Sequence, residues 1–102
     1  MTEKELYNAL RKTHFPVAHN AFEKRQSPPY VIYTNVDYKT VAANSKQTLT
    51  QPTVCVELYI NRNDVIAESK IESVLNELTT YSKSKSYISE EKVYLIRYEF
   101  EL

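Results

Sequence analysis

The sequence predicts an α+β fold, a two-layer sandwich in which two helices cover one face of a mostly antiparallel or mixed sheet. Two segments carry apolar residues at helical spacing, and two others alternate apolar and polar residues as half-buried strands do. Strands of this kind favour an antiparallel or mixed sheet whose apolar face lies under the helices. The expected order of elements is α-β-β-β-α-β-β, and the 102 residues fit a single domain, 1–102.

A first short helix is expected at residues 3–13. Thr2 can cap its N-terminus, and acidic residues in the first turn and basic residues in the last turn complement the helix dipole. Leu6 and Leu10 belong to an apolar stripe along one side of this helix. Pro16 ends any continuation, because the residue before a proline is pushed out of the α region.

The strands of the N-terminal half are less regular. Residues 13–29 show no clear period, so we expect a long connector there, of a kind that is often functional. A strand is expected to begin at Tyr30 and to run toward Val36, since this stretch is rich in β-branched and aromatic residues. A second strand is expected at residues 38–43, followed by a polar tract at residues 44–47.

The clearest strand spans residues 48–61. One set of its side chains is apolar, and the other set, which points to the opposite face, is mixed. The apolar set is Val54, Val56, Leu58 and Ile60, and the mixed set is Cys55, Glu57 and Tyr59. The apolar set is therefore expected to face the helices.

The C-terminal half begins with a second helix, expected at residues 64–81. Its apolar stripe is Ala67, Ile71, Val74, Leu75 and Leu78. Residues 82–85 are expected to form a polar connector. A hairpin then turns near residues 89–92 and ends in a strand at residues 93–102, where apolar and polar positions alternate.

Composition excludes several classes of function. The formal net charge of zero argues against a general nucleic-acid binder, whose affinity comes from neutralising phosphates. The chain contains no glycine, so no Gly-rich phosphate cradle is possible, and turns with positive φ are expected to fall on Asn, Asp or Lys. No apolar run approaches the ~20 residues of a membrane span. The start shows no apolar signal-peptide core, so we expect folding in a reducing, cytoplasmic environment.

Charge is distributed unevenly along the chain. Residues 1–51 carry seven Lys/Arg against four Asp/Glu, and residues 52–102 carry six against nine. The halves therefore have net charges of +3 and −3. This asymmetry arises by chance in many folds, because the halves of a sequence interleave. It is also compatible with opposite faces that are complementary and favour self-association.

Residues that carry catalytic or metal chemistry are few. His14 and His19 lie five positions apart without a ligand-spacing motif, and Cys55 is the only cysteine. A thiol inside a strand, between two valines, is expected to behave as a small buried hydrophobe rather than as a nucleophile. We therefore predict no catalytic, metal-binding or cofactor-binding residue, and no enzymatic activity.

Nine tyrosines without a tryptophan allow two interpretations. Tyrosine suits half-buried strands, and it is also favoured at the cores of protein interfaces. The second face of the sheet helps to choose between these interpretations. It carries Glu57 and Tyr59 on one strand and Leu95 and Arg97 on another. This mixture is too polar for a core and too apolar for an ordinary solvent-exposed surface. We interpret this face as a subunit contact.

Read in order, four stretches and a helix form a pattern that covers most of the chain. They are Phe15-Pro16-Val17-Ala18 followed by Phe22, Pro28-Pro29-Tyr30-Val31-Ile32-Tyr33, Val56-Glu57-Leu58-Tyr59, a Glu-rich helix, and Val93-Tyr94-Leu95-Ile96-Arg97-Tyr98-Glu99-Phe100. This pattern resembles small neck and tail-completion proteins of long-tailed bacteriophages and related prophages. Known tail terminators share the helix–strands–helix–strand order expected above.

The resemblance implies a non-enzymatic tail terminator that forms a ring, commonly a hexamer, caps the finished tail tube and docks to the head connector. The implied partners are further copies of the chain, the tail tube protein and the head connector protein, without a membrane or a specific nucleic acid. The implied location is the cytoplasm of an infected or lysogenic bacterium and then the virion tail or neck. Two alternatives stay open: another head–tail connector or completion protein, and a small phage-encoded adaptor that binds a host protein.

The resemblance implies that the polar stretch at residues 43–51 is a loop available to the tube or the connector. The interface candidates are drawn from this stretch, the tyrosines, the mixed face and the stretches that carry the resemblance. They are Phe15, Tyr30, Tyr33, Lys46, Gln47, Glu57, Tyr59, Leu95 and Arg97.

Overall fold

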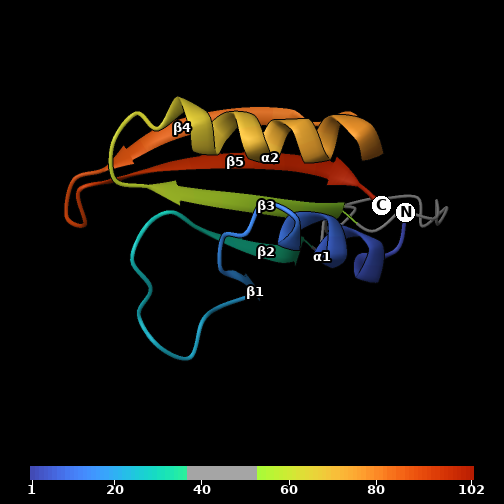
Figure 1. Ribbon diagram of the computed structural model, residues 1–102, viewed down its shortest axis with the longest axis horizontal. Helices are drawn as coiled ribbons and strands as arrows, with labels where there is room; N and C mark the ends of the chain where they lie inside the picture. The colour runs from blue at the N-terminus through green and yellow to red at the C-terminus, as the bar shows by residue number, and fades with distance from the viewer. Residues whose placement is uncertain (37–52) are drawn as a thin grey trace, which may run out of the picture.

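Seven elements make up the computed structural model, which describes residues 1–36 and 53–102 (Figure 1). They are α1 (Glu3–Arg11), β1 (Val17–His19), β2 (Tyr30–Val36), β3 (Thr53–Ile60), α2 (Val65–Leu78), β4 (Ser82–Ile88) and β5 (Val93–Glu101). The strands form one sheet in the order β1-β2-β3-β5-β4, in which β1 and β2 are parallel and the other pairs are antiparallel. The predicted α+β class and the order α-β-β-β-α-β-β are confirmed.

Two local predictions were wrong. Residues 17–19 form β1, a three-residue strand inside the segment expected to be a connector. Residues 82–85 belong to β4, although their alternation of serine and lysine was expected to mark a polar connector. The strand predicted at residues 38–43 lies outside the described residues.

Both helices start at capped N-termini. Thr2 and Glu5 form a capping box at α1, in which the Thr2 hydroxyl accepts from the Glu5 backbone N–H at 3.1 Å and a Glu5 carboxylate oxygen accepts from the Thr2 backbone N–H at 3.2 Å. At α2, the Asp64 carboxylate accepts from the Ala67 backbone N–H at 3.0 Å. Neither of these two helices, the ones in the described part of the chain, is long and apolar enough to cross a membrane.

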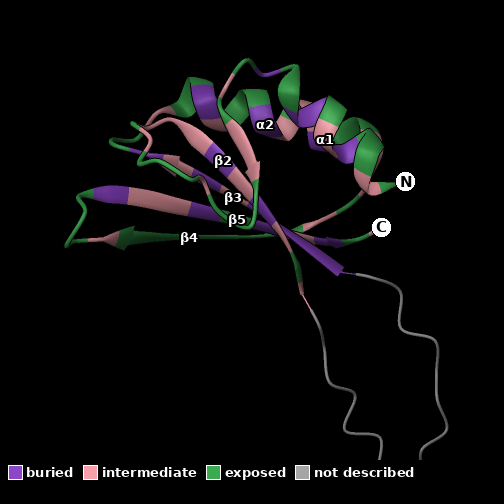
Figure 2. Cartoon of the chain, turned by 90° about the horizontal axis from the view of Figure 1, so that it is seen from below, coloured by how far each residue is buried: buried purple, intermediate pink, exposed green. Residues whose placement is uncertain are grey.

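The core lies between the two helices and one face of the sheet. Figure 2 shows both helices on the same side of the sheet, with buried positions along the helix surface that faces it. Cross-strand pairs such as Val31–Leu58 and Leu58–Ile96 bring side chains of β2, β3 and β5 together on that side. Burial of each such aliphatic side chain contributes about 1.5–3 kcal/mol, so this layer provides most of the stability.

Ion pairs hold the edge strand β4 against α2. The Lys83 ammonium contacts the carboxylates of both Glu68 and Glu72, and the Lys85 ammonium lies 3.3 Å from Glu68 and 2.7 Å from the Asn63 side-chain oxygen. The hydrogen bond from Lys83 lowers the pKa of Glu68, and the same contact raises the pKa of Lys83. These contacts explain why a strand rich in lysine is stable at the sheet edge.

Tight backbone turns occur without glycine. Positive φ is found at His14 (68°), Asn20 (71°) and Lys92 (56°) among the described residues. Asn and Lys are residue types expected from the sequence, whereas the histidine was not expected. Lys92 ends the turn that joins β4 to β5, where the left-handed conformation of a residue with a Cβ costs about 1–2 kcal/mol.

Replacing Ile71 by alanine is expected to lower the free energy of unfolding by about 2–5 kcal/mol, because it leaves a cavity between α2 and the sheet. Urea unfolding followed by circular dichroism measures this change. Ser69→Ala, on the exposed side of the same helix, is the matched control and is expected to stay within about 0.5 kcal/mol of the unmodified chain. Equal losses for the two variants would contradict the described packing of α2.

Candidate functional site: the open face of the sheet

The sheet face opposite the helices has no helix over it among the described residues, and we call it the open face (Figure 2). Four cross-strand rows of β2, β3 and β5 lie on it: Tyr30–Tyr59–Leu95, Ile32–Glu57–Arg97, Thr34–Cys55–Glu99 and Val36–Thr53–Glu101. The register therefore brings together five of the nine interface candidates, namely Tyr30, Glu57, Tyr59, Leu95 and Arg97. The two mixed strand faces predicted from the sequence form a single continuous surface.

One end of the open face is aromatic. The rings of Tyr30 and Tyr59 stack with centroids 4.7 Å apart and an interplanar angle of 12°, and the Phe22 ring meets Tyr30 edge-on at 5.6 Å. Val93 is only 7% exposed although it belongs to this face. The segment of residues 20–29 thus supplies cover at this end, whereas the rows further along β5 are partly exposed.

The middle of the open face is charged. The Arg97 guanidinium lies 3.6 Å from the Glu57 carboxylate and 3.5 Å from the Glu99 carboxylate, and its Nε donates to the Cys55 sulfur at 3.4 Å. The Tyr59 hydroxyl donates to the Glu57 carboxylate at 3.1 Å. One cation therefore serves two carboxylates, and the network fixes the directions of these side chains.

Burial governs the protonation of the two weak acids in this network. Desolvation raises the pKa of the Cys55 thiol, and the hydrogen bond from Arg97 opposes this increase. Cys55 has no exposed surface, so the predicted burial of this thiol is confirmed. Desolvation, followed by the charge of Glu57, raises the pKa of Tyr59 far above its ordinary value. Both groups stay neutral at neutral pH.

The other interface candidates lie elsewhere. Tyr33 points to the helix-covered face, is 5% exposed and packs near Tyr7 and His19, so the structure places it in the core rather than on a docking surface. Phe15 lies away from the open face, with the Lys70 ammonium 5.6 Å from the centre of its ring. Lys46 and Gln47 lie outside the described residues.

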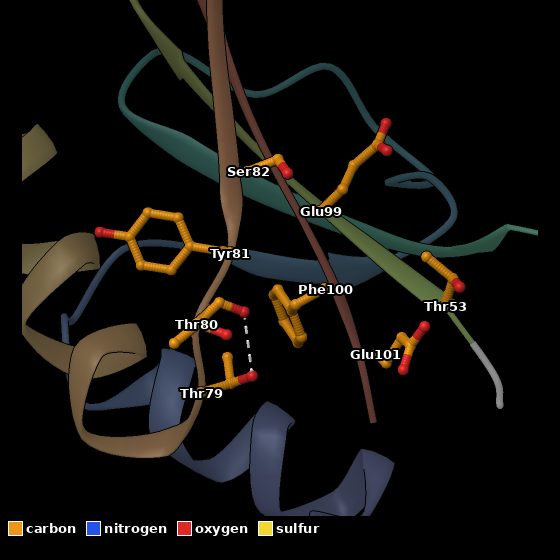
Figure 3. Close-up of a pocket in the computed structure, with 8 residues that line it drawn as sticks. All are labelled: Thr53, Thr79, Thr80, Tyr81, Ser82, Glu99, Phe100 and Glu101. Carbon is orange, nitrogen blue, oxygen red and sulfur yellow. Dashed lines mark hydrogen bonds between the residues drawn. The ribbon is translucent and has the colours of Figure 1, made fainter.

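A hollow of about 580 Å³ opens at the far end of the sheet, where α2 passes into β4 (Figure 3). Its lining combines the carboxylates of Glu99 and Glu101 with hydroxyl groups, and the Thr79 hydroxyl donates to the Thr80 carbonyl oxygen at 3.1 Å. Its lining residues include no histidine, cysteine, lysine or arginine. This arrangement presents acceptors and negative charge, without a nucleophile paired to a base.

A second hollow, of about 530 Å³, lies beside the aromatic end of the open face. Phe22, Tyr30 and Val93 line its apolar side, and Lys24 and Arg25 are among its polar lining residues. Sequence reasoning missed this part of the surface, because residues 20–29 carry no period that assigns them to either face. The sequence features that could have indicated this surface were Phe22 and the pair Pro28-Pro29. Neither feature specifies where the segment packs in the folded chain.

The histidines do not gather ligands. The His19 ring nitrogen lies 3.4 Å from the Glu3 carboxylate and 3.3 Å from the Asn35 side-chain oxygen, and His14 is exposed elsewhere. Within residues 1–36 and 53–102, no group of three or more His, Cys, Asp or Glu side chains is placed to hold a metal ion.

The folded state is expected to lose stability as pH rises above about 10, because the pKa of Tyr59 is higher in the folded than in the unfolded chain. The folded chain keeps this proton where the unfolded chain releases it. The stabilisation is therefore complete below the unfolded pKa and decreases as pH rises toward the folded pKa. Urea unfolding at neutral and alkaline pH measures the decrease, and Tyr59→Phe should make it shallower. Identical pH dependence in both chains would contradict the described environment of Tyr59.

Neither a protein-family model nor a curated protein sequence matches this chain.

Proposed function

We propose that this chain is a non-enzymatic structural protein of the tail or neck of a long-tailed bacteriophage or prophage. In this proposal it acts as a tail terminator, which forms a homo-oligomeric ring, caps the tail tube and docks to the head connector. It is made in the cytoplasm of the bacterial host and ends in the virion. The observation that carries the proposal is the open face, together with the resemblance in sequence pattern described above.

The composition of the open face supports docking. Its aromatic row, Tyr30–Tyr59–Leu95, is partly exposed and offers apolar area next to a hydroxyl group. Glu57, Arg97 and Glu99 form a charged zone beside this row. An apolar patch beside hydrogen-bonded charges is typical of protein interfaces, where tyrosine and arginine are enriched. Stacked tyrosine rings are not required on a surface that contacts only solvent.

The chemistry of the face supports recognition rather than bond making. Its thiol is buried and its pKa is raised, which is opposite to the shift that activates a cysteine nucleophile. Its central carboxylates are engaged with Arg97, and Glu57 also accepts from Tyr59. Fixed charges of this kind determine the register and orientation of a bound protein.

Lysine at Tyr59 or at Leu95 is expected to leave the monomer folded and to weaken self-association, because a new charge would be placed in the apolar part of the contact. Sedimentation velocity at high protein concentration measures the assembly, and circular dichroism checks the fold. Ser73→Lys on the exposed side of α2 is the matched control. Unchanged assembly of the Tyr59 and Leu95 variants would remove the open face from the proposal.

Deletion of the gene from its phage or prophage is expected to give tails of uncontrolled length that fail to join heads, because nothing would cover the growing end of the tube. Electron microscopy of lysates measures the tail length, and the gene supplied in trans restores it. Tails of normal length that carry heads would contradict a terminator role. Capture of one host protein by a monomeric chain would favour the adaptor alternative.

A further inference from the structure

The two edges of the sheet differ in how well they are protected from pairing with another strand. Strand β1, at one edge, has three residues, and strand β4, at the other edge, has seven. A long edge strand presents a row of N–H and C=O groups that can pair with a further strand, whereas a short one offers few. Within residues 1–36 and 53–102, β4 pairs only with β5, so its outer edge is open. The following inference concerns this edge and does not rest on the proposed function.

Strand β4 lacks several features that keep edge strands apart. It contains no proline, and its pairing with β5 is continuous from residue 82 to residue 88, without a bulge. Figure 2 shows it as an exposed strand along the outer side of β5. Ser84 lies opposite Arg97 and Ser86 lies opposite Leu95, so these two serines extend the open face with small side chains. Neither the backbone nor this side of β4 therefore blocks a further strand.

The charges of β4 are neutralised within the molecule. Lys83 and Lys85 are side chains of the kind that protects an edge strand by repelling a copy of itself. The Lys83 ammonium, however, contacts the carboxylates of Glu68 and Glu72, and the Lys85 ammonium also contacts Glu68. Two lysines and two glutamates sum to zero charge. A second copy of the strand therefore meets little net charge at this edge.

The positions of the lysines favour one way for two β4 strands to pair. Two identical antiparallel strands pair about a twofold axis, and the residue on the axis lies opposite itself. An axis through any of residues 83–85 places lysine opposite lysine, which is unfavourable. An axis through Ser86 instead places Lys85 opposite Tyr87 of the second copy and pairs residues 84–88 of both strands. This is the longest pairing of two β4 strands that brings no lysine opposite another.

Exposed apolar side chains lie close to this axis. Tyr87 is 53% exposed, and the aliphatic stem of Lys85 from the second copy would lie beside its ring. Val65, which is 67% exposed, precedes Glu72 by two helical turns and so lies on the flank of α2 that faces β4. The Lys85 ammonium is 2.7 Å from the side-chain oxygen of Asn63, which places the start of α2 near the axis. Pairing would therefore cover apolar surface that the monomer leaves in solvent.

We propose that two copies of this chain pair antiparallel through their β4 strands, about a twofold axis through Ser86. The five-stranded sheets of the two copies then form one sheet of ten strands, and backbone hydrogen bonds between the strands supply the affinity. The axis is normal to the sheet, so the helices of both copies lie on one side. On the other side the two open faces join into one continuous surface across the serines of β4. The edge and the open face are separate surfaces, so the dimer can also take part in the proposed ring.

Substitution of Ser86 tests the axis directly, because this residue lies opposite itself. Ser86→Lys and Ser86→Asp are each expected to weaken the dimer by at least about tenfold, since two like charges then face each other. An equal mixture of the two variants is expected to form a heterodimer, in which lysine faces aspartate. Sedimentation velocity measures the dimer, and circular dichroism checks each fold. Ser73→Lys, on the exposed side of α2, is the control and should dimerise like the unmodified chain.

Amide hydrogen exchange gives a second readout that needs no substitution. Residues 84–88 are expected to exchange more slowly in concentrated than in dilute protein, because their outward N–H groups become hydrogen-bonded. Tyr59→Lys is expected to lose larger assemblies and to keep the dimer. A chain that stays monomeric at high concentration, Ser86 variants that dimerise normally, or a mixture that does not recover would overturn the β4 contact. A dimer that is lost in Tyr59→Lys and kept in both Ser86 variants would overturn it as well, while still supporting the proposed function.

Discussion

The packing of both helices on the same face of the sheet is the constraint on which the rest of the structure depends. Leu10 of α1 and Ile71 of α2 belong to one core with Leu58 of the central strand β3. Because the two helices of residues 1–36 and 53–102 both cover one face, neither of them lies over the other face. The alternation along β3 then directs Glu57 and Tyr59 to the uncovered side. The open face is thus a direct consequence of how the core is built.

The open face is ordered by its own side chains. Cys55 is completely buried although neither described helix lies over it, and the Arg97 side chain donates a hydrogen bond to its sulfur. The stacked rings of Tyr30 and Tyr59 restrict each other in the same way. Side chains that are already fixed lose little conformational entropy on binding, so a partner gains more from each contact. The same network that orders these side chains is therefore compatible with the proposed docking at this face.

Periodicity predicted the part of the structure that buries the most apolar surface. The alternation at β3 and β5 and the helical stripe at α2 assigned Glu57, Tyr59, Leu95 and Arg97 to one face before their register was known. Alternation along β2 places Tyr33 on the same face as the buried Val31, in the core. The prediction of Tyr33 as an interface residue was therefore wrong. Three-residue β1 is too short to show a period. Strand β4 depends on ion pairs with Glu68 and Glu72, which are distant in sequence. A local sequence pattern therefore predicts neither β1 nor β4.

A ring closes only if the angle between its two contact surfaces is fixed. The two hollows at the ends of the sheet both border β5, since Val93 lines one and Glu101 lines the other. This strand is paired on both sides, with β3 and β4, so it cannot bend independently of the sheet. The ion pairs from Lys83 and Lys85 to α2 further hold the β4 side. A strand that is paired on both sides thus fixes the relation between the two ends of the open face, which is compatible with the proposed ring.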